Sequence, residues 1–142
     1  MTEGAAAAVR LADLDELLFR QVHPSWMRGD EATSQAFKPT PKDAGRLSVA
    51  RASMTTAEAA FQLHTGSRGF ASVGTWAVTL EEVDKAPVSL RAFHDPLTEP
   101  VADPAHAYID FTGRSRKEIE TKAKLLLAAA RARGRLHPAQ IP

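Results

Sequence analysis

Several residue types and patterns are missing from this chain, and each absence excludes a class of protein. The 142 residues contain no cysteine, which excludes a disulfide scaffold, a thiolate metal site, an iron–sulfur cluster and a cysteine nucleophile. The longest apolar run, Leu125 to Ala130, has six residues, whereas a membrane helix needs ~20. The chain does not open on a basic segment followed by an apolar stretch, so we expect no signal peptide, no membrane partner and a cytoplasmic location.

A strong excess of charge of one sign is also lacking. The chain has 18 basic and 17 acidic side chains and a net charge of +1, which excludes a simple polyelectrolyte. By region, residues 28–51 sum to +2, residues 81–103 to −4 and residues 110–135 to +5. One interpretation is that these segments pair their charges with one another. The other is a basic face, built from 28–51 and the C-terminal segment, that is offered to phosphate or to an acidic partner.

Large apolar side chains are scarce. The apolar fraction is 44%, but 26 of these residues are alanine, which leaves about a quarter of the chain to build a core. That amount suits one modest core and is too small for two. We therefore predict one domain over residues 11–136, with flexible tails at 1–10 and 137–142.

The spacing of the remaining apolar residues predicts an α+β fold. We expect a mixed or antiparallel sheet of about five strands and two main helices, the C-terminal one packed on the sheet. A helical spacing also predicts a short helix over Leu11–Leu18. The predicted strands are Leu17–Val22, Leu47–Arg51, Val73–Leu80, Val88–Phe93 and Ala105–Phe111, and a single helical turn is expected within Thr79–Lys85.

Capping signals mark the two main helices. Thr55 with Glu58 fits a capping box for the first, although Thr56 is an equally good start, and Gly66 is a plausible stop. Ser115 with Glu118 fits a capping box for the C-terminal helix. In that helix Glu118 also lies four residues before Lys122, the order typical of a helical ion pair.

Residues 20–51 concentrate the reactive and polar side chains. Arg20 and His23 are three residues apart at the end of a predicted strand, and a bend at Pro24 would bring both to one cleft. His23 has the chemistry of an acid, a base or a hydrogen-bond donor near neutral pH. The alternative is a ring that packs at the strand end, with one nitrogen on a backbone carbonyl.

A proline-stiffened loop follows at residues 24–46. We expect it to be ordered by packing its own aromatics, Trp26 and Phe37. Two ammonium groups held by a restricted backbone suit phosphate oxygens, and the alternative is a solvated loop. The loop's candidate ligand-binding side chains are Ser34, Gln35, Lys38 and Lys42.

Other sites receive less support from the residues. Arg114, Arg116 and Lys117 at a predicted helix start suit an anion, or else are solvated, and neither GxGxxG nor GxxxxGK[ST] is present. The histidines, at positions 23, 64, 94, 106 and 137, show no metal-ligand spacing, so no metal site is predicted. No GxSxG motif supports a Ser-His-Asp triad.

Five segments carry a resemblance. RQVHPSW (20–26), SQAFKPTPKD (34–43), LSVAR (47–51), TTAEAAFQLHTG (55–66) and SVGTWAVT (72–79) resemble a family of small bacterial proteins over roughly residues 17–133. The resemblance implies a bacterial cytoplasmic origin and an accessory or defence-system role, and it brings no established activity.

A second, weaker resemblance is to NAD-consuming folds of the RES and ADP-ribosyltransferase type. It implies that Arg20, Ser48 and a helix at 56–65 occupy the matching positions. The family's catalytic glutamate would be Glu58, Glu81 or Glu82.

Three functional hypotheses follow. The first is a module that binds a phosphate-bearing or acidic ligand, or a partner protein, without a cofactor. The second is an enzyme acting on NAD or a nucleotide, in which Arg20 grips phosphate or ribose and His23 orients the substrate. The third is a nucleic-acid-associated protein that uses Trp26, Phe37 and the C-terminal cations. The ligand-binding residues under the first hypothesis are Arg20, His23, Ser34, Gln35, Lys38, Lys42 and Ser48.

Overall fold

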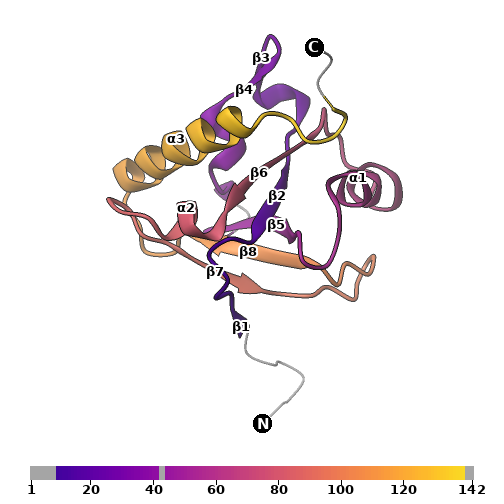
Figure 1. Ribbon diagram of the computed structural model, residues 1–142, viewed down its shortest axis with the longest axis horizontal. Coiled ribbons are helices and arrows are strands. Elements are labelled where there is room, and N and C mark those ends of the chain that lie inside the picture. The colour runs from indigo at the N-terminus through magenta and orange to yellow at the C-terminus, as the bar shows by residue number, and fades with distance from the viewer. Residues whose placement is uncertain (1–8, 42–43, 140–142) are drawn as a thin grey trace.

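A computed structural model describes residues 9–41 and 44–139, and these form one α+β domain (Figure 1). Six antiparallel strands make the main sheet, in the order β1-β7-β8-β5-β2-β6. The strands are β1 (Val9–Arg10), β2 (Leu17–Gln21), β5 (Arg46–Arg51), β6 (Thr75–Thr79), β7 (Arg91–His94) and β8 (His106–Asp110). The predicted fold class is confirmed, and the sheet is antiparallel rather than mixed.

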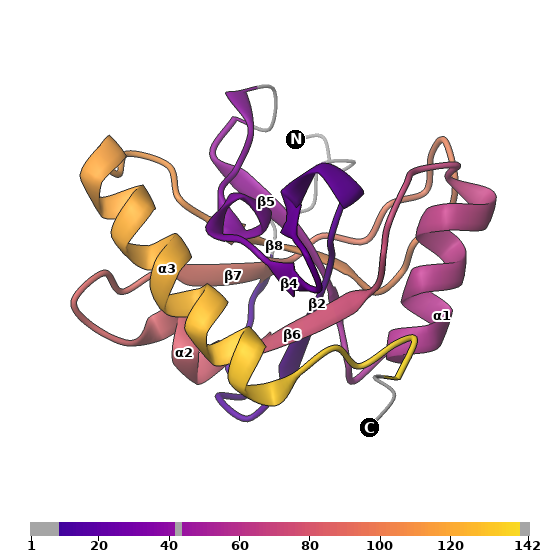
Figure 2. The ribbon, with the colours of Figure 1, turned by 90° about the horizontal axis from the view of Figure 1, so that it is seen from above.

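The described helices are α1 (Ala57–Gln62), α2 (Leu80–Asp84) and α3 (Arg116–Arg133). Figures 1 and 2 show α3 and α1 on opposite sides of the molecule, with the sheet between them. The helix α3 packs on the sheet as predicted. Its fully buried residues, Ala123, Leu126 and Ala130, recur at helical spacing and join the core cluster that contains Leu18 and Val78 of the sheet.

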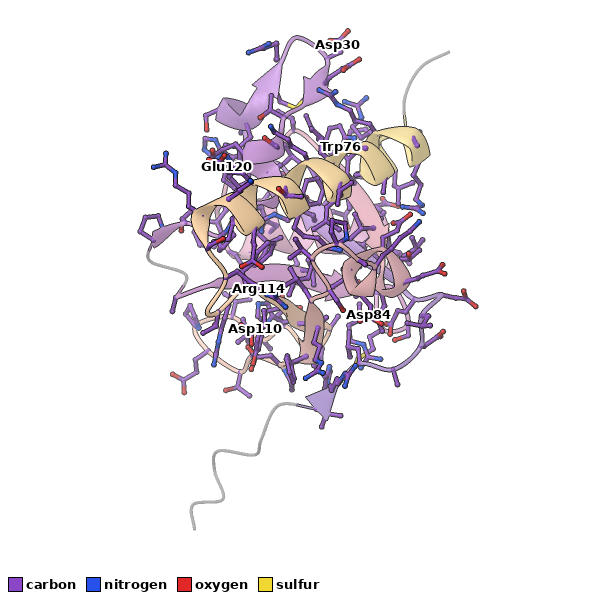
Figure 3. All side chains as sticks on the ribbon, turned by 90° about the vertical axis from the view of Figure 1, so that its left-hand side faces the viewer. Asp30, Trp76, Asp84, Asp110, Arg114 and Glu120 are labelled. Atoms are coloured by element: carbon purple, nitrogen blue, oxygen red, sulfur yellow. The ribbon has the colours of Figure 1, made fainter. Side chains whose placement is uncertain are left out.

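The described part of the predicted loop, residues 24–41, packs on the domain core. It contains a small hairpin of β3 (Met27–Arg28) and β4 (Glu31–Ala32), whose turn carries Asp30 at one end of the molecule (Figure 3). Phe37 is completely buried, so the loop is held partly by its own aromatic side chain, as expected. A buried Phe37 is not accessible for stacking on a base, which the nucleic-acid hypothesis requires.

The start of the chain differs from the prediction. Residues 11–16 form no helix, because Leu11 donates its backbone N–H to the carbonyl of Ala92 and so continues the sheet edge. Glu16 turns inward to meet Arg51, with an N–O distance of 2.9 Å. The helical spacing at 11–18 is overridden because Leu11 bonds to a neighbouring strand, and Leu17 and Leu18 belong to β2, which pairs with β6.

Both ends of the sheet extend into the predicted tails. Val9 and Arg10 pair with His94 and Phe93 of β7. At the other end, His137 forms a bridge with Thr75. The remaining tail residues, 1–8 and 140–142, lie outside the described residues.

The predicted cap of the C-terminal helix is confirmed, and of the two starts predicted for the first helix Thr56 is confirmed and Thr55 is not. Ser115 and Glu118 form a reciprocal capping box on α3. The N-cap of α1 is Thr56, whose side chain accepts from the N–H of Ala59; the third helical residue is then an alanine without a carboxylate, so the predicted box of Thr55 with Glu58 is wrong. Gly66 does not end the helix either, because α1 continues as a π-helical turn over Leu63–Ser67.

The predicted ion pair of Glu118 with Lys122 is also wrong. Glu118 pairs with Arg114 at 3.4 Å. Lys122 is buried and its Nζ donates to the carbonyls of Glu82 and Lys85, at 2.7 and 3.0 Å. The predicted turn at α2 is confirmed, with Thr79 and Glu82 as its capping box. In the described part of the chain, no helix is long and apolar enough to span a bilayer.

Candidate functional site

A cavity of about 550 Å³ lies between the sheet and the helical segment α1 with its π-helical turn. Its walls come from β2, β5, the start of β8, the π-helical turn and the loop at 68–71. The side chains that carry its chemistry are Arg20, His23, Ser48, His64, Arg68 and His106. The volume lies within the range of small-molecule sites.

Diverging strands open one wall of the cavity. Backbone pairing between β2 and β5 covers only Leu18 with Arg51 and Phe19 with Ala50. Beyond that point the Arg20 guanidinium bridges the gap, because its Nη1 donates to the carbonyl of Ser48 at 2.9 Å and its Nε to the carbonyl of Ala36 at 2.8 Å. A buried cation therefore stands where a regular ladder would have continued.

His23 and Trp26 form the rim beside Arg20. The Arg20 guanidinium lies 5.2 Å from the centre of the Trp26 ring, and the rings of His23 and Trp26 are 5.7 Å apart. His23 is exposed. It is the N-cap of a 3₁₀ turn at Pro24–Trp26, and its Nδ1 accepts from the backbone N–H of Ser25. The turn brings Arg20 and His23 to one cavity, as predicted. The hydrogen-bonded ring nitrogen of His23 accepts from Ser25, whereas the alternative prediction placed it on a backbone carbonyl.

The π-helical turn supplies a second group of side chains. His64 lies 5.2 Å from the Phe70 ring, and the Arg68 guanidinium lies 5.3 Å from the same ring. Arg68 also forms an ion pair with Asp103, at 3.6 Å. Burial, and then the charges of Arg68 and Arg20, lower the pKa of His64 to about 4. His64 is therefore neutral at pH 7, and the cavity's permanent positive charge comes from its two arginines.

His106 connects the cavity floor to a carboxylate. Its Nε2 lies 3.2 Å from the Ser48 hydroxyl oxygen. Its Nδ1 lies 2.8 Å from the carbonyl oxygen of Asp95 and 3.3 Å from an oxygen of the Asp95 carboxylate. His106 is buried, whereas Ser48 is exposed to the cavity.

The structure brings together only part of the predicted site. Arg20, His23 and Ser48 line the cavity, but Ser34, Gln35 and Lys38 do not. Those three lie in or just after a 3₁₀ turn over Ser34–Phe37, which contributes the backbone carbonyl that Arg20 binds. Lys42 lies outside the described residues.

Sequence reasoning missed His64, Arg68 and His106 as site residues. Ser48 and His106 are separated by 58 residues, and no short motif links them. The neighbourhood of β5 and β8 in the sheet sets their distance. His64 and Arg68 are four residues apart, and this spacing alone is common on surface helices.

Two of the three cations predicted at the start of α3, Arg114 and Arg116, have partners within the protein. Arg114 donates to the carbonyl of Ser89 at 2.8 Å, and Arg116 forms an ion pair with Glu120 at 3.6 Å. Ser115 caps the first turn, so this end of α3 offers no built anion site. Within residues 9–41 and 44–139, no three His, Asp or Glu side chains are grouped so as to hold a metal ion.

Comparisons of the chain with protein-family models, with curated proteins and with solved structures found no match. The resemblances to a small bacterial family and to NAD-consuming folds therefore stay predictions. The chemistry of the cavity residues is what indicates a function for this protein.

Proposed function

We propose that this protein binds a small phosphate-bearing or otherwise acidic ligand that also carries a flat ring. The observation that carries the proposal is that two guanidinium groups, those of Arg20 and Arg68, line one cavity together with the rings of Trp26 and Phe70. Guanidinium groups match the geometry of phosphate and carboxylate oxygens. Aromatic rings suit the flat part of a nucleotide-like molecule.

Each cavity arginine is held against an aromatic ring. Arg20 lies over Trp26 and Arg68 over Phe70, at 5.2 and 5.3 Å from the ring centres. Such contacts restrict a long side chain and lower the entropy cost of presenting its charge to an anion. The arginines outnumber Asp103, the one acidic residue in the described wall, so the cavity keeps a positive balance at neutral pH.

Isothermal titration calorimetry tests the proposal with inorganic phosphate, AMP, ADP-ribose and NAD as probes. We expect at least one ring-bearing phosphate to bind, and Arg68→Gln to weaken it roughly tenfold or more, because a hydrogen bond to a charged group is worth ~1.5–3 kcal/mol. Arg116→Gln is the matched control, since Arg116 is an exposed arginine outside the cavity with its own carboxylate partner. The absence of binding by every probe, or equal weakening in both variants, would overturn the proposal.

NAD turnover is the second candidate. Arg20 and Ser48, the positions implied by the resemblance to NAD-consuming folds, lie on one wall and are joined by a hydrogen bond of 2.9 Å. The three candidate glutamates are not in that wall: Glu58 contacts Gln62, and Glu82 caps α2. Release of nicotinamide from NAD, lost in Arg20→Gln, supports this candidate, and unchanged NAD contradicts it.

A further inference from the structure

We propose that Ser48, His106 and Asp95 form a nucleophile–base–carboxylate relay that hydrolyses carboxylic esters in this cavity. The three residues come from β5, β8 and the residue that follows β7, and only the sheet brings them together. The relay would give the cavity a hydrolytic activity. Its preference for anionic esters rests on the proposed function, the binding of an acidic ligand in the same cavity.

The hydrogen bonds of His106 determine which ring nitrogen carries the proton. A backbone carbonyl can only accept, so Nδ1, 2.8 Å from the Asp95 carbonyl, must bear the hydrogen in the neutral ring. Nε2 is then an acceptor and faces the Ser48 hydroxyl at 3.2 Å. This is the tautomer that a general base beside a serine requires.

Asp95 is the positioning residue of the relay. Its carboxylate lies 3.3 Å from Nδ1 of His106 and 35% of that side chain is exposed. A carboxylate at this distance stabilises the imidazolium that forms when His106 takes a proton. The Asp95 backbone carbonyl continues to hold the ring when the side chain is changed, so substitution tests the charge separately from the ring position.

Ser48 is accessible because β2 diverges from β5 beside it. The Arg20 guanidinium, 2.9 Å from the Ser48 carbonyl oxygen, holds a fixed positive charge beside the Ser48 backbone, and both residues line the same cavity. Negative charge that develops on an ester oxygen at Ser48 is stabilised by this cation in a partly enclosed site.

The reaction has two balanced steps. The Ser48 oxygen attacks the ester carbonyl carbon, its proton passes to Nε2 of His106, and the departing alcohol takes that proton as the ester bond breaks. A water molecule then attacks the acyl-serine, His106 takes the water proton and returns it to the Ser48 oxygen, and the carboxylic acid leaves. No oxidant, reductant or metal is needed.

Two measurements on the full chain test the relay. The first treats the wild-type protein with a fluorophosphonate, which forms a serine–phosphorus bond with loss of fluoride, and locates the adduct by mass spectrometry. The second compares hydrolysis of p-nitrophenyl acetate, which is neutral, with that of mono-p-nitrophenyl succinate, which is anionic. We expect one adduct, on Ser48, and faster hydrolysis of the anionic ester.

Variants separate the roles of the three residues. Ser48→Ala and His106→Gln should each lower kcat/KM by roughly 100-fold or more, whereas Asp95→Asn should lower kcat by ~10-fold or more with little change in KM. Ser89→Ala is the matched control, because the exposed Ser89 hydroxyl meets Asp84 at 2.7 Å but has no histidine partner; it should leave hydrolysis unchanged. Thermal unfolding of each variant checks its fold.

The outcomes distinguish this inference from the ligand proposal. Absence of an adduct on Ser48, together with hydrolysis that survives Ser48→Ala, would overturn the relay whatever the binding experiment shows. An adduct on Ser48 with equal rates for both esters, unaffected by Arg68→Gln, would support the relay and contradict the anionic ligand. The adduct is located in the wild-type protein, so a variant that fails to fold does not remove the test.

Discussion

The two sides of the sheet differ in what their side chains do. On the α3 side, Leu18, Val78 and Leu126 are completely buried and belong to one continuous core. On the cavity side, the sheet faces Arg68, two histidines (His64 and His106) and a half-exposed Phe70. The α3 side is packed like a protein interior, whereas the opposite side borders a cavity of about 550 Å³ that is lined by charged side chains.

The buried cations Lys122 and Arg20 also differ in what they contact. On the α3 side Lys122 is buried and its ammonium group donates to two backbone carbonyls, which fastens α3 to α2. Arg20, which leaves β2 on the same face as Leu18, likewise donates to two backbone carbonyls, yet its guanidinium also lines the cavity and, after burial and the charge of Arg68, helps to lower the pKa of His64. Lys122 therefore stabilises the fold alone, whereas Arg20 stabilises the fold and also lines a cavity large enough for a ligand.

The largest expected effect comes from matched leucine truncations on the two sides. Leu126→Ala should lower the free energy of unfolding by about 2–5 kcal/mol, because it leaves a cavity in a fully packed region. Leu63→Ala, in the wall of the existing cavity, should cost clearly less, because its side chain already borders open space. Urea unfolding of both variants measures the difference. Equal losses of unfolding free energy in the two variants would show that the two sides contribute equally to stability.

A smaller effect concerns the pH dependence due to Lys122. Burial lowers the pKa of Lys122 from 10.5 to about 8, so between these values the unfolded chain binds more protons than the folded one. Stability therefore rises with pH across that interval and is unaffected by this group below it. Relative to Lys122→Met, the wild-type protein should gain about 1–3 kcal/mol from pH 7.5 to 10.5. Parallel stability curves for the two proteins would contradict this.

The smallest effect is the pH dependence due to His64 on the cavity side. Its folded pKa is lowered from 6.5 to about 4, so protons bind first to the unfolded chain and stability falls as the pH drops through this interval. We expect a loss of roughly 1–2 kcal/mol, reduced by solvent screening, which should be absent in His64→Gln. Urea unfolding at pH 7 and pH 4.5 measures it.

A bound anion sharpens this last test. Because part of the lowering comes from the charges of Arg68 and Arg20, a phosphate beside them should raise the pKa of His64, seen as a shifted NMR titration of its ring protons. The resonances of His137, which does not line the cavity, are the internal reference. A His64 titration that does not change with AMP would place the anion elsewhere.

Local signals predicted much of the fold. The Ser115–Glu118 box is set by residues three positions apart, and the structure confirms it, as it confirms the packing of α3 on the sheet. The predicted strands at 47–51 and 105–111 are also present as β5 and β8. Prediction was wrong where a distant partner competes with a local preference: Leu11 bonds to Ala92 instead of beginning a helix.

The candidate site was predictable only in part, because its members are far apart in the chain. Arg20 and His23 are close in sequence and reach the cavity together, but Ser34, Gln35 and Lys38 share their segment and do not. Polar composition marks a segment without saying which way its side chains point. His106 gave no signal at all, since its partners Ser48 and Asp95 are 58 and 11 residues away.

Composition and local patterning by themselves determined that this chain has material for one core, no thiol chemistry and a capped C-terminal helix. Those properties depend on residue types and on contacts within a few positions. Only the tertiary structure decided the cavity, the burial of Lys122 and the meeting of Ser48 with His106. The cavity and the meeting of Ser48 with His106 depend on strand order and on where β2 diverges from β5, and the burial of Lys122 depends on the packing of α3 against α2. Contacts between segments far apart in the sequence set all three.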